Sequence, residues 1–161
     1  ARVSAQVSKE AERIAKKTME VLHGAGVFGI EMFVTQDERV LINEIAPRVH
    51  NSGHHTLQSS ATSQFEQHLR AILGLDLGKT DLLHYTVMCN ILGPKNFHGI
   101  YQPIEIQQKN GVYLKMYQKD EAKPQRKMGH FNVVDTRDTK DIESLIRKAN
   151  EVKGLIKFNP V

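Results

Sequence analysis

The sequence has no tryptophan, a single cysteine and few aromatic residues, and each scarcity argues against a class of protein. With aromatic residues at 6%, broad stacking surfaces for nucleic-acid bases are not expected. One cysteine excludes an internal disulfide framework and a cysteine-rich zinc site. No apolar run approaches the roughly 18 residues that a membrane span needs, and no basic-then-apolar signal segment opens the chain. We expect a soluble protein of a reducing compartment, with neither membrane nor nucleic acid as partner.

The charge balance is mildly basic. Lysine and arginine number 22 against 18 aspartates and glutamates, so the net charge of the 161 residues is +4. This excess suits small anionic ligands and does not require a polyanionic partner. Hydrophobic residues at 40% and charged residues at 25% are ordinary for a globular chain that buries a core.

The first half of the chain shows helical and strand patterns in turn. Apolar residues recur at helical spacing from Ser4 to Leu22, and Gly24 and Gly26 are expected to end that helix. Two short apolar runs, 27–34 and 40–45, flank a polar segment and predict an antiparallel hairpin. Residues 46–60 have no period and predict an ordered loop, followed by a helix over 62–73 with Thr62 as its N-cap.

The second half is richer in strands. Runs over 85–92, 111–117 and 130–134 predict three strands, and residues 141–152 predict a final helix. A boundary is expected near residues 75–81. The pattern predicts an α+β chain in two parts, 1–80 and 81–161, the second of them small and β-rich.

Two glutamates interrupt the apolar runs of the predicted hairpin. If its turn is centred between Asp37 and Glu38, Glu31 lies directly opposite Glu44. Like charges in that position destabilise a sheet, whereas two carboxylates on one face suit a hard cation such as Mg²⁺. The alternative is that both face solvent on a half-exposed hairpin. Asn43 falls on the opposite face in this register, so a bulge or a backbone contact must intervene if all three serve one site.

The segment 48–55 is dense in hydrogen-bonding groups. Arg48 offers a planar donor fork for phosphate or carboxylate, and residues 51–53 can expose backbone N–H groups to an anion. Three histidines at His50, His54 and His55 suggest zinc, but further ligands are lacking nearby. Composition alone favours a polar turn with surface histidines.

A cationic cluster follows in the second half. Such a cluster is usually a solvated loop, and an anion pocket is the alternative. Its members are Lys119, Lys123, Arg126, Lys127 and His130.

The runs Gly29–Phe33 and Asn43–His54 resemble one particular family. It is the ATP-grasp family of N5-carboxyaminoimidazole ribonucleotide synthetases, the ATPase subunit or domain of phosphoribosylaminoimidazole carboxylase. The resemblance continues through 62–70, 90–93 and 126–130, and the run 43–54 is not shared by ATP-grasp proteins at large. It implies that 1–80 are the C-terminal part of an ATP-grasp domain and that 81–161 are a small β-rich C-terminal domain that closes the substrate site.

The resemblance also implies a reaction of purine biosynthesis. Members of this family of ADP-forming ligases use MgATP and bicarbonate to carboxylate aminoimidazole ribonucleotide through carboxyphosphate. The resemblance implies Mg²⁺ as cofactor, a cytoplasmic homodimer (plastid in a plant) and, in some organisms, a fused C-terminal mutase domain. A chain without the first half of the nucleotide cleft is expected to be inactive alone. The alternatives are another ATP-grasp purine ligase or transformylase, and a non-catalytic truncated binding module.

Carried over residue by residue, the resemblance implies a role for each motif. Glu31 and Glu44 would bind Mg²⁺, and Asn43 and Glu44 would bind the nucleotide. Arg48 and His50 would be catalytic.

The remaining residues implied by the resemblance would bind the substrate: Asn51, Ser52, Lys119 and Arg126. The last two would hold its ribose phosphate. Gln118 and Gln125 stand where the family commonly has glycine before that lysine and that arginine, so the two local turns could differ from the family's.

Overall fold

The computed structural model describes residues 3–102, 104 and 110–161, which form two compact units. Unit 1 consists of Ala1–His54 and Thr62–Thr80, and unit 2 of His55–Ala61 and Asp81–Val161. Each unit combines helices with antiparallel strands, so the predicted α+β class is confirmed. Within the described ranges, no helix has both the length and the apolar character to cross a membrane.

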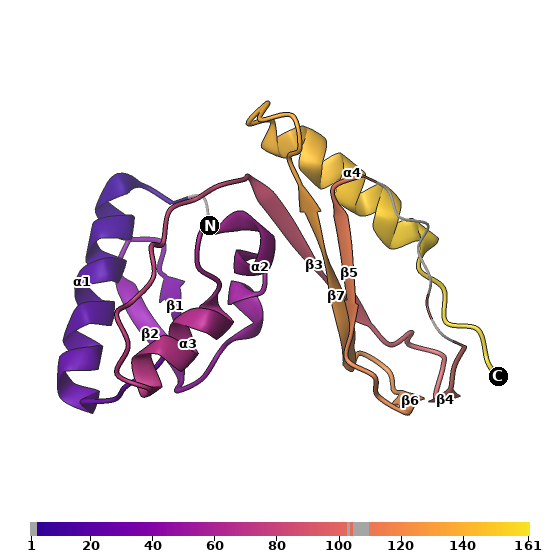
Figure 1. Cartoon of the computed structure of the whole chain (residues 1–161), viewed down its shortest axis with the longest axis horizontal. Coiled ribbons are helices and arrows are strands. Elements are labelled where there is room, and N and C mark those ends of the chain that lie inside the picture. Colours follow the sequence, from indigo (N-terminus) through magenta and orange to yellow (C-terminus); the bar gives the residue numbers. More distant parts are fainter. Residues whose placement is uncertain (1–2, 103, 105–109) are drawn as a thin grey trace. The chain divides into compact units, whose positions relative to one another are not determined.

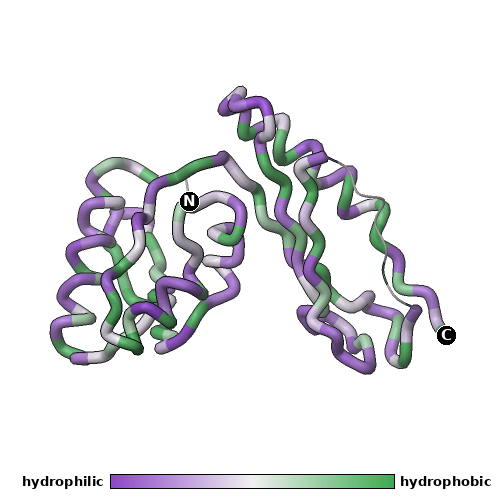
Figure 2. The backbone as a smooth tube through the Cα atoms, in the orientation of Figure 1, coloured by the Kyte–Doolittle hydropathy of each residue, from purple (hydrophilic) through white to green (hydrophobic). Residues whose placement is uncertain are grey.

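Unit 1 is built from an amphipathic helix and a hairpin. Helix α1 (Ala5–Leu22) packs against strands β1 (Gly29–Val34) and β2 (Val40–Ala46), with Val7 buried (Figure 1). Hydrophilic and hydrophobic positions alternate around α1, as Figure 2 shows. Helix and hairpin are therefore confirmed, because hydrophobic periodicity dominates both.

The ends of α1 are capped by side chain and backbone. The Ser4 hydroxyl accepts a hydrogen bond from the backbone N–H of Val7, which satisfies one of the free donors at the start of the helix. At the other end, His23 adopts a left-handed conformation with φ 50° and donates its backbone N–H to Met19. The helix thus ends before the predicted Gly24, because a histidine takes the position that glycine usually occupies.

The predicted loop 46–60 is more regular than its composition indicates. It contains a 3₁₀ turn, η1 (Asn51–Gly53), and a short helix, α2 (Thr56–Ser59). The following helix, α3, spans Gln64–Ile72, and its N-cap is Ser63, whose hydroxyl accepts from the N–H of Glu66. The prediction of Thr62 as N-cap was wrong by one residue.

Unit 2 is a three-stranded antiparallel sheet with one helix on it and a small second ribbon (Figure 1). Its strands are β3 (Thr86–Leu92), β4 (Gly99–Ile100), β5 (Val112–Met116), β6 (Glu121–Ala122) and β7 (Lys127–Val134). The main sheet has the order β3–β7–β5, and β4 pairs with β6. Helix α4 (Ile142–Leu155) packs on this sheet, where Phe131, Met128 and Val152 are fully buried. The predicted strands and final helix are confirmed, although β7 begins earlier than expected and β4 and β6 were not predicted.

Candidate functional site

The hairpin of unit 1 brings two carboxylates together. Glu31 of β1 pairs directly with Glu44 of β2, as the sequence predicted. Nearer the turn, however, Met32 pairs with Ile42, so the register shifts by one residue between the two pairs. Asn43 is the extra residue, and it forms a β-bulge. The turn is therefore centred on Asp37 and not between Asp37 and Glu38 as predicted, and the bulge restores the pairing of the glutamates.

The bulge also settles the position of Asn43. Its side-chain amide donates a hydrogen bond of 3.3 Å to Oε2 of Glu31. A bulge bends a strand and redirects a side chain, which is how Asn43 reaches the glutamate despite its place in the sequence. The carboxylates remain 44% (Glu31) and 58% (Glu44) exposed, so a ligand can reach them.

His50 is the third member of this cluster. Its Nε2 lies 3.5 Å from Oε1 of Glu31 and 4.0 Å from Oε1 of Glu44. Its Nδ1 lies 2.8 Å from the hydroxyl of Ser52, and only 13% of its side chain is exposed. One ligand atom from each of Glu31, Glu44 and His50 lies within 4.8 Å of the other two, which is compact enough to hold one cation.

The sequence did not reveal what holds this histidine in place. The buried side chain of Gln64, at the start of α3, accepts from the backbone N–H of His50 (2.9 Å) and donates to its carbonyl (2.8 Å). The same amide nitrogen lies 2.9 Å from Nδ1 of His54. Gly29 lies so close that an added Cβ would be 2.6 Å from Cβ of His50. A small residue in β1 and a distant glutamine thus fix the loop.

The other residues predicted for this loop are exposed or partly exposed. Arg48 is exposed, and its guanidinium donates to the carbonyl of Val49 (3.1 Å). Asn51 opens the 3₁₀ turn directly after His50, and Ser52 is exposed beside the histidine ring. The segment that directly follows Glu44 in the sequence therefore carries exposed cationic and polar side chains.

The three histidines of the loop do not form one metal site. The ring of His54 stacks on Phe65 with centroids 5.5 Å apart, and Nδ1 of His55 lies 2.8 Å from the hydroxyl of Ser59. Burial lowers the pKa of His55. Among the described residues, the one group suited to a metal ion contains His50 alone of the three.

In unit 2, Lys119 and Arg126 line a common pocket of about 330 Å³. The ammonium of Lys119 donates to the carbonyl of Lys127 (2.7 Å) and lies 5.9 Å from the ring centroid of Tyr117. Desolvation and, to a lesser degree, the charge of Arg126 lower the pKa of Lys119. Two cations that disfavour each other in this way suit an anion that would neutralise both.

The turns before these cations have the conformation that glycine favours. Gln118 has φ 51° and Gln125 has φ 60°, both in the left-handed region. Both glutamines are therefore accommodated in this conformation, at some cost in strain. They thus adopt a backbone conformation that glycine would also adopt.

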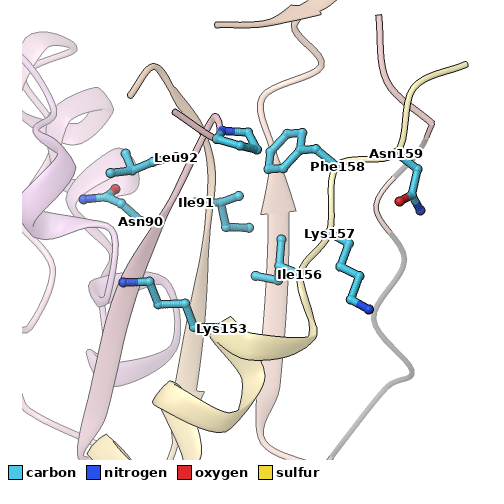
Figure 3. A pocket seen from close by; sticks show the side chains of 9 residues that line it. Asn90, Ile91, Leu92, Lys153, Ile156, Lys157, Phe158 and Asn159 are labelled. Atoms are coloured by element: carbon cyan, nitrogen blue, oxygen red, sulfur yellow. The ribbon is translucent and has the colours of Figure 1, made fainter. Parts of the chain in front are cut away.

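A second pocket of unit 2, of about 470 Å³, lies between β3 and the segment after α4 (Figure 3). Phe158 lies beside the apolar side chains of Ile91 and Ile156, and Lys153 and Asn90 contribute polar groups. The described residues that line it include none of the predicted site residues.

Comparison with known proteins gives two family matches. Residues 1–65 match the model of the ATP-grasp domain, and residues 86–144 match the model of the phosphoribosylaminoimidazole carboxylase C-terminal domain. The N5-carboxyaminoimidazole ribonucleotide synthase of Aquifex aeolicus is 49% identical over 147 residues, which are 91% of this chain and 39% of that protein.

Solved structures agree with these matches. The N5-carboxyaminoimidazole ribonucleotide synthetase of Thermotoga maritima is 46% identical, with a TM-score of 0.88 over 100% of this chain and 45% of its own. The Aspergillus clavatus enzyme in complex with ADP and 5-aminoimidazole ribonucleotide is 32% identical, with a TM-score of 0.76 over 95% of this chain and 42% of its own. The chain spans about two fifths of the length of the curated relatives it matches.

Proposed function

Since this chain belongs to the N5-carboxyaminoimidazole ribonucleotide synthase family of ATP-grasp proteins, we propose that it is part of an enzyme of purine biosynthesis. That enzyme would use ATP and bicarbonate to carboxylate 5-aminoimidazole ribonucleotide, with release of ADP and phosphate. The observation that carries the proposal is the opposed pair Glu31 and Glu44 with Asn43 beside it, next to the loop that holds His50.

The carboxylate pair would hold the Mg²⁺ of MgATP. The residues fit a hard cation, because two exposed carboxylates offer oxygen ligands on the same side of the hairpin. The two negative charges also repel each other, and a bound cation would remove that repulsion. When bound, Mg²⁺ would neutralise charge on the nucleotide phosphates. Asn43 would orient Glu31 through its 3.3 Å hydrogen bond and contact the nucleotide with Glu44.

The loop after β2 would bind bicarbonate and the reacting amine. Arg48 would bind an anionic oxygen through its exposed guanidinium fork, in exchange for the hydrogen bond that Nη1 donates to the carbonyl of Val49. His50, fixed by Gln64 and Ser52, would hold or move a proton at Nε2. Asn51 and Ser52 would contact the substrate from the 3₁₀ turn.

Lys119 and Arg126 would bind the phosphate of the ribonucleotide. Their shared pocket and the lowered pKa of Lys119 support this, since a dianion would compensate both cations. We also propose that residues 1–80 act as the C-terminal part of the ATP-grasp domain and 81–161 as the substrate-binding C-terminal domain. The complete protein would be a cytoplasmic homodimer and could carry a fused C-terminal mutase domain.

The test uses an enzyme of full family length that carries this chain as its C-terminal part. We expect ADP formation that requires both bicarbonate and aminoimidazole ribonucleotide. Glu31→Gln and Glu44→Gln should each lower kcat by about 100-fold or more, since each removes a charge that stabilises the transferring phosphoryl group. Glu38→Gln, on the turn of the same hairpin, is the matched control and should leave kcat unchanged.

Other outcomes separate the alternatives. ADP formation driven by formate or another amine would assign the chain to a different ATP-grasp ligase. No nucleotide hydrolysis, with binding of aminoimidazole ribonucleotide retained, would favour a non-catalytic module. Activity of residues 1–161 alone would contradict our expectation that the isolated chain lacks part of the nucleotide cleft.

A further inference from the structure

The imidazole of His50 adds a nitrogen ligand to the two carboxylates, and Mg²⁺ does not favour nitrogen ligands. Magnesium takes oxygen ligands, whereas imidazole nitrogen is a preferred ligand of zinc and other transition metals. We propose that Glu31, Glu44 and His50 form a Zn²⁺ site, which competes with Mg²⁺ for the same carboxylates. Its regulatory meaning rests on the proposed function, but the binding itself does not.

The spacing of the three ligand atoms supports zinc. Two atoms bound to one Zn²⁺ at about 2.1 Å in a tetrahedron lie about 3.4 Å apart. In the structure, Nε2 of His50 lies 3.5 Å from Oε1 of Glu31 and 4.0 Å from Oε1 of Glu44, and all three ligand atoms lie within 4.8 Å of one another. Small rotations of the exposed carboxylates would therefore complete three of the four tetrahedral positions. The fourth would remain open for water or a phosphate oxygen.

The histidine is held in the orientation that a metal ligand needs. In zinc-bound histidines, the N–H of the other ring nitrogen usually donates a hydrogen bond to an oxygen acceptor, which fixes the orientation and tautomer of the ring. Here the hydroxyl of Ser52 lies 2.8 Å from Nδ1, and a hydroxyl can either donate or accept. Nδ1 also accepts a hydrogen bond from the backbone N–H of Ser52 (3.4 Å) when it carries no proton. Zinc binding would therefore place the ring proton on Nδ1, where it is donated to the Ser52 hydroxyl, and would leave the lone pair of Nε2 facing the carboxylates. The backbone contacts of Gln64 keep the ring in this position.

Zinc at this site would inhibit the proposed reaction in two ways. It would occupy the carboxylates that hold Mg²⁺, and it would bind Nε2 of His50, the atom assigned to proton transfer. Binding of one Zn²⁺ would thus both exclude Mg²⁺ and block proton transfer by His50. Zinc generally exceeds magnesium in affinity for a mixed nitrogen and oxygen site, so a low concentration of free Zn²⁺ would suffice.

The experiment measures metal binding to the 161-residue chain without nucleotide, by calorimetric titration with Zn²⁺ and with Mg²⁺. We expect Zn²⁺ to bind at least about 100-fold more tightly than Mg²⁺. His50→Gln should weaken the affinity for Zn²⁺ by about tenfold or more and change the affinity for Mg²⁺ by less than about twofold, because it removes only the nitrogen ligand. Titration with Co²⁺ should give the visible absorption of a low-coordinate ion, which His50→Gln abolishes.

A matched control is available in unit 2. His98 lies 3.7 Å from the carboxylate of Glu121 and is exposed, so it offers one histidine with a single carboxylate. His98→Gln should leave Zn²⁺ affinity unchanged. Equal Zn²⁺ affinity in wild type and His50→Gln, or Zn²⁺ binding no tighter than Mg²⁺ binding, would overturn the proposal. Neither result depends on carboxylation activity, so failure of the proposed function remains distinguishable.

Discussion

Glu31 and Glu44 lie directly opposite each other in the hairpin because Asn43 is an extra residue in β2. In an unbroken ladder continued from Met32 and Ile42, Asn43 would oppose Glu31 and Glu44 would point to the other face. The bulge therefore puts both carboxylates on one face and leaves the amide of Asn43 in contact with Glu31. A local irregularity of one residue creates the site.

Neutralising one glutamate should have opposite effects on stability and on cation binding. In the metal-free chain, Glu31→Gln or Glu44→Gln removes a like-charge pair and should stabilise the fold by about 0.2–1 kcal/mol. The same change should weaken Mg²⁺ binding by about tenfold, since a carboxylate ligand is lost. Urea unfolding with chelator present and titration with Mg²⁺ measure the two effects. Loss of stability together with unchanged Mg²⁺ affinity would mean that the pair is structural.

Gln64 should be a positioning residue for the loop that carries His50. Gln64→Ala removes two hydrogen bonds to the backbone of His50 and should cost about 2–3 kcal/mol of unfolding free energy. Amide hydrogen exchange in residues 50–54 should accelerate, and the affinity for Zn²⁺ should fall.

Gln67 provides the control for that experiment. Its side chain makes the same pair of hydrogen bonds to the backbone of Gly78 (2.8 and 2.9 Å), away from the glutamates along the chain. Gln67→Ala should cost similar stability but leave Zn²⁺ affinity unchanged. If both variants lose Zn²⁺ affinity equally, Gln64 acts only through global stability.

Much of the fold follows from periodicity in the sequence. Helix α1, the hairpin β1–β2 and the strands of unit 2 have strong apolar patterns that tertiary packing only reinforces. The pairing of Glu31 with Glu44 was predicted from hairpin geometry. It holds because the bulge at Asn43 cancels the one-residue difference in register that the shifted turn introduces.

The parts that could not be predicted depend on contacts between distant or irregular residues. Gln64 acts on His50 across 14 positions of the chain, and a polar residue at the start of a helix carries no pattern that signals this role. The bulge at Asn43 was not predictable either, because one extra polar residue hardly changes the apolar pattern of β2. The left-handed backbone of Gln118 and Gln125 also contradicts residue preference, so propensity alone predicts other turns.

The glutamines in left-handed conformation should be replaceable by glycine with a gain in stability. A non-glycine residue pays roughly 1–2 kcal/mol in that region, and the added freedom of glycine in the unfolded chain offsets part of the gain. Gln118→Gly and Gln125→Gly should each stabilise the chain by about 0.5–1 kcal/mol in urea unfolding. The control Lys123→Gly, at an exposed position with no positive φ, should destabilise it. Destabilisation by all three changes would show that the glutamine side chains contribute more than their backbone strain costs.

Asp135 should make the stability of unit 2 dependent on pH. Burial opposes its charge, but hydrogen bonds from the backbone of Arg137 (3.1 Å) and Lys140 (2.8 Å) and from the hydroxyl of Thr139 (3.0 Å) outweigh burial and lower its pKa. A carboxyl whose pKa is lower in the folded state stabilises the fold fully above about pH 4, the pKa of an unfolded aspartate. That contribution is lost as the pH falls through the lower pKa of the folded state.

Asp135→Asn tests this dependence, because an amide of similar size cannot carry the charge and directs its own N–H groups at the same donors. We expect a lower Tm than wild type at pH 7 and a difference that shrinks as the pH falls from about 4 through the lowered pKa of the folded carboxyl, since the wild-type carboxyl then also becomes neutral. Thermal unfolding followed by circular dichroism across this range measures both. Asp138→Asn, at an exposed position of the same loop, should retain the wild-type pH profile. A difference in Tm between wild type and Asp135→Asn that stays constant from pH 7 to pH 2 would show that the carboxylate charge is not what holds the loop.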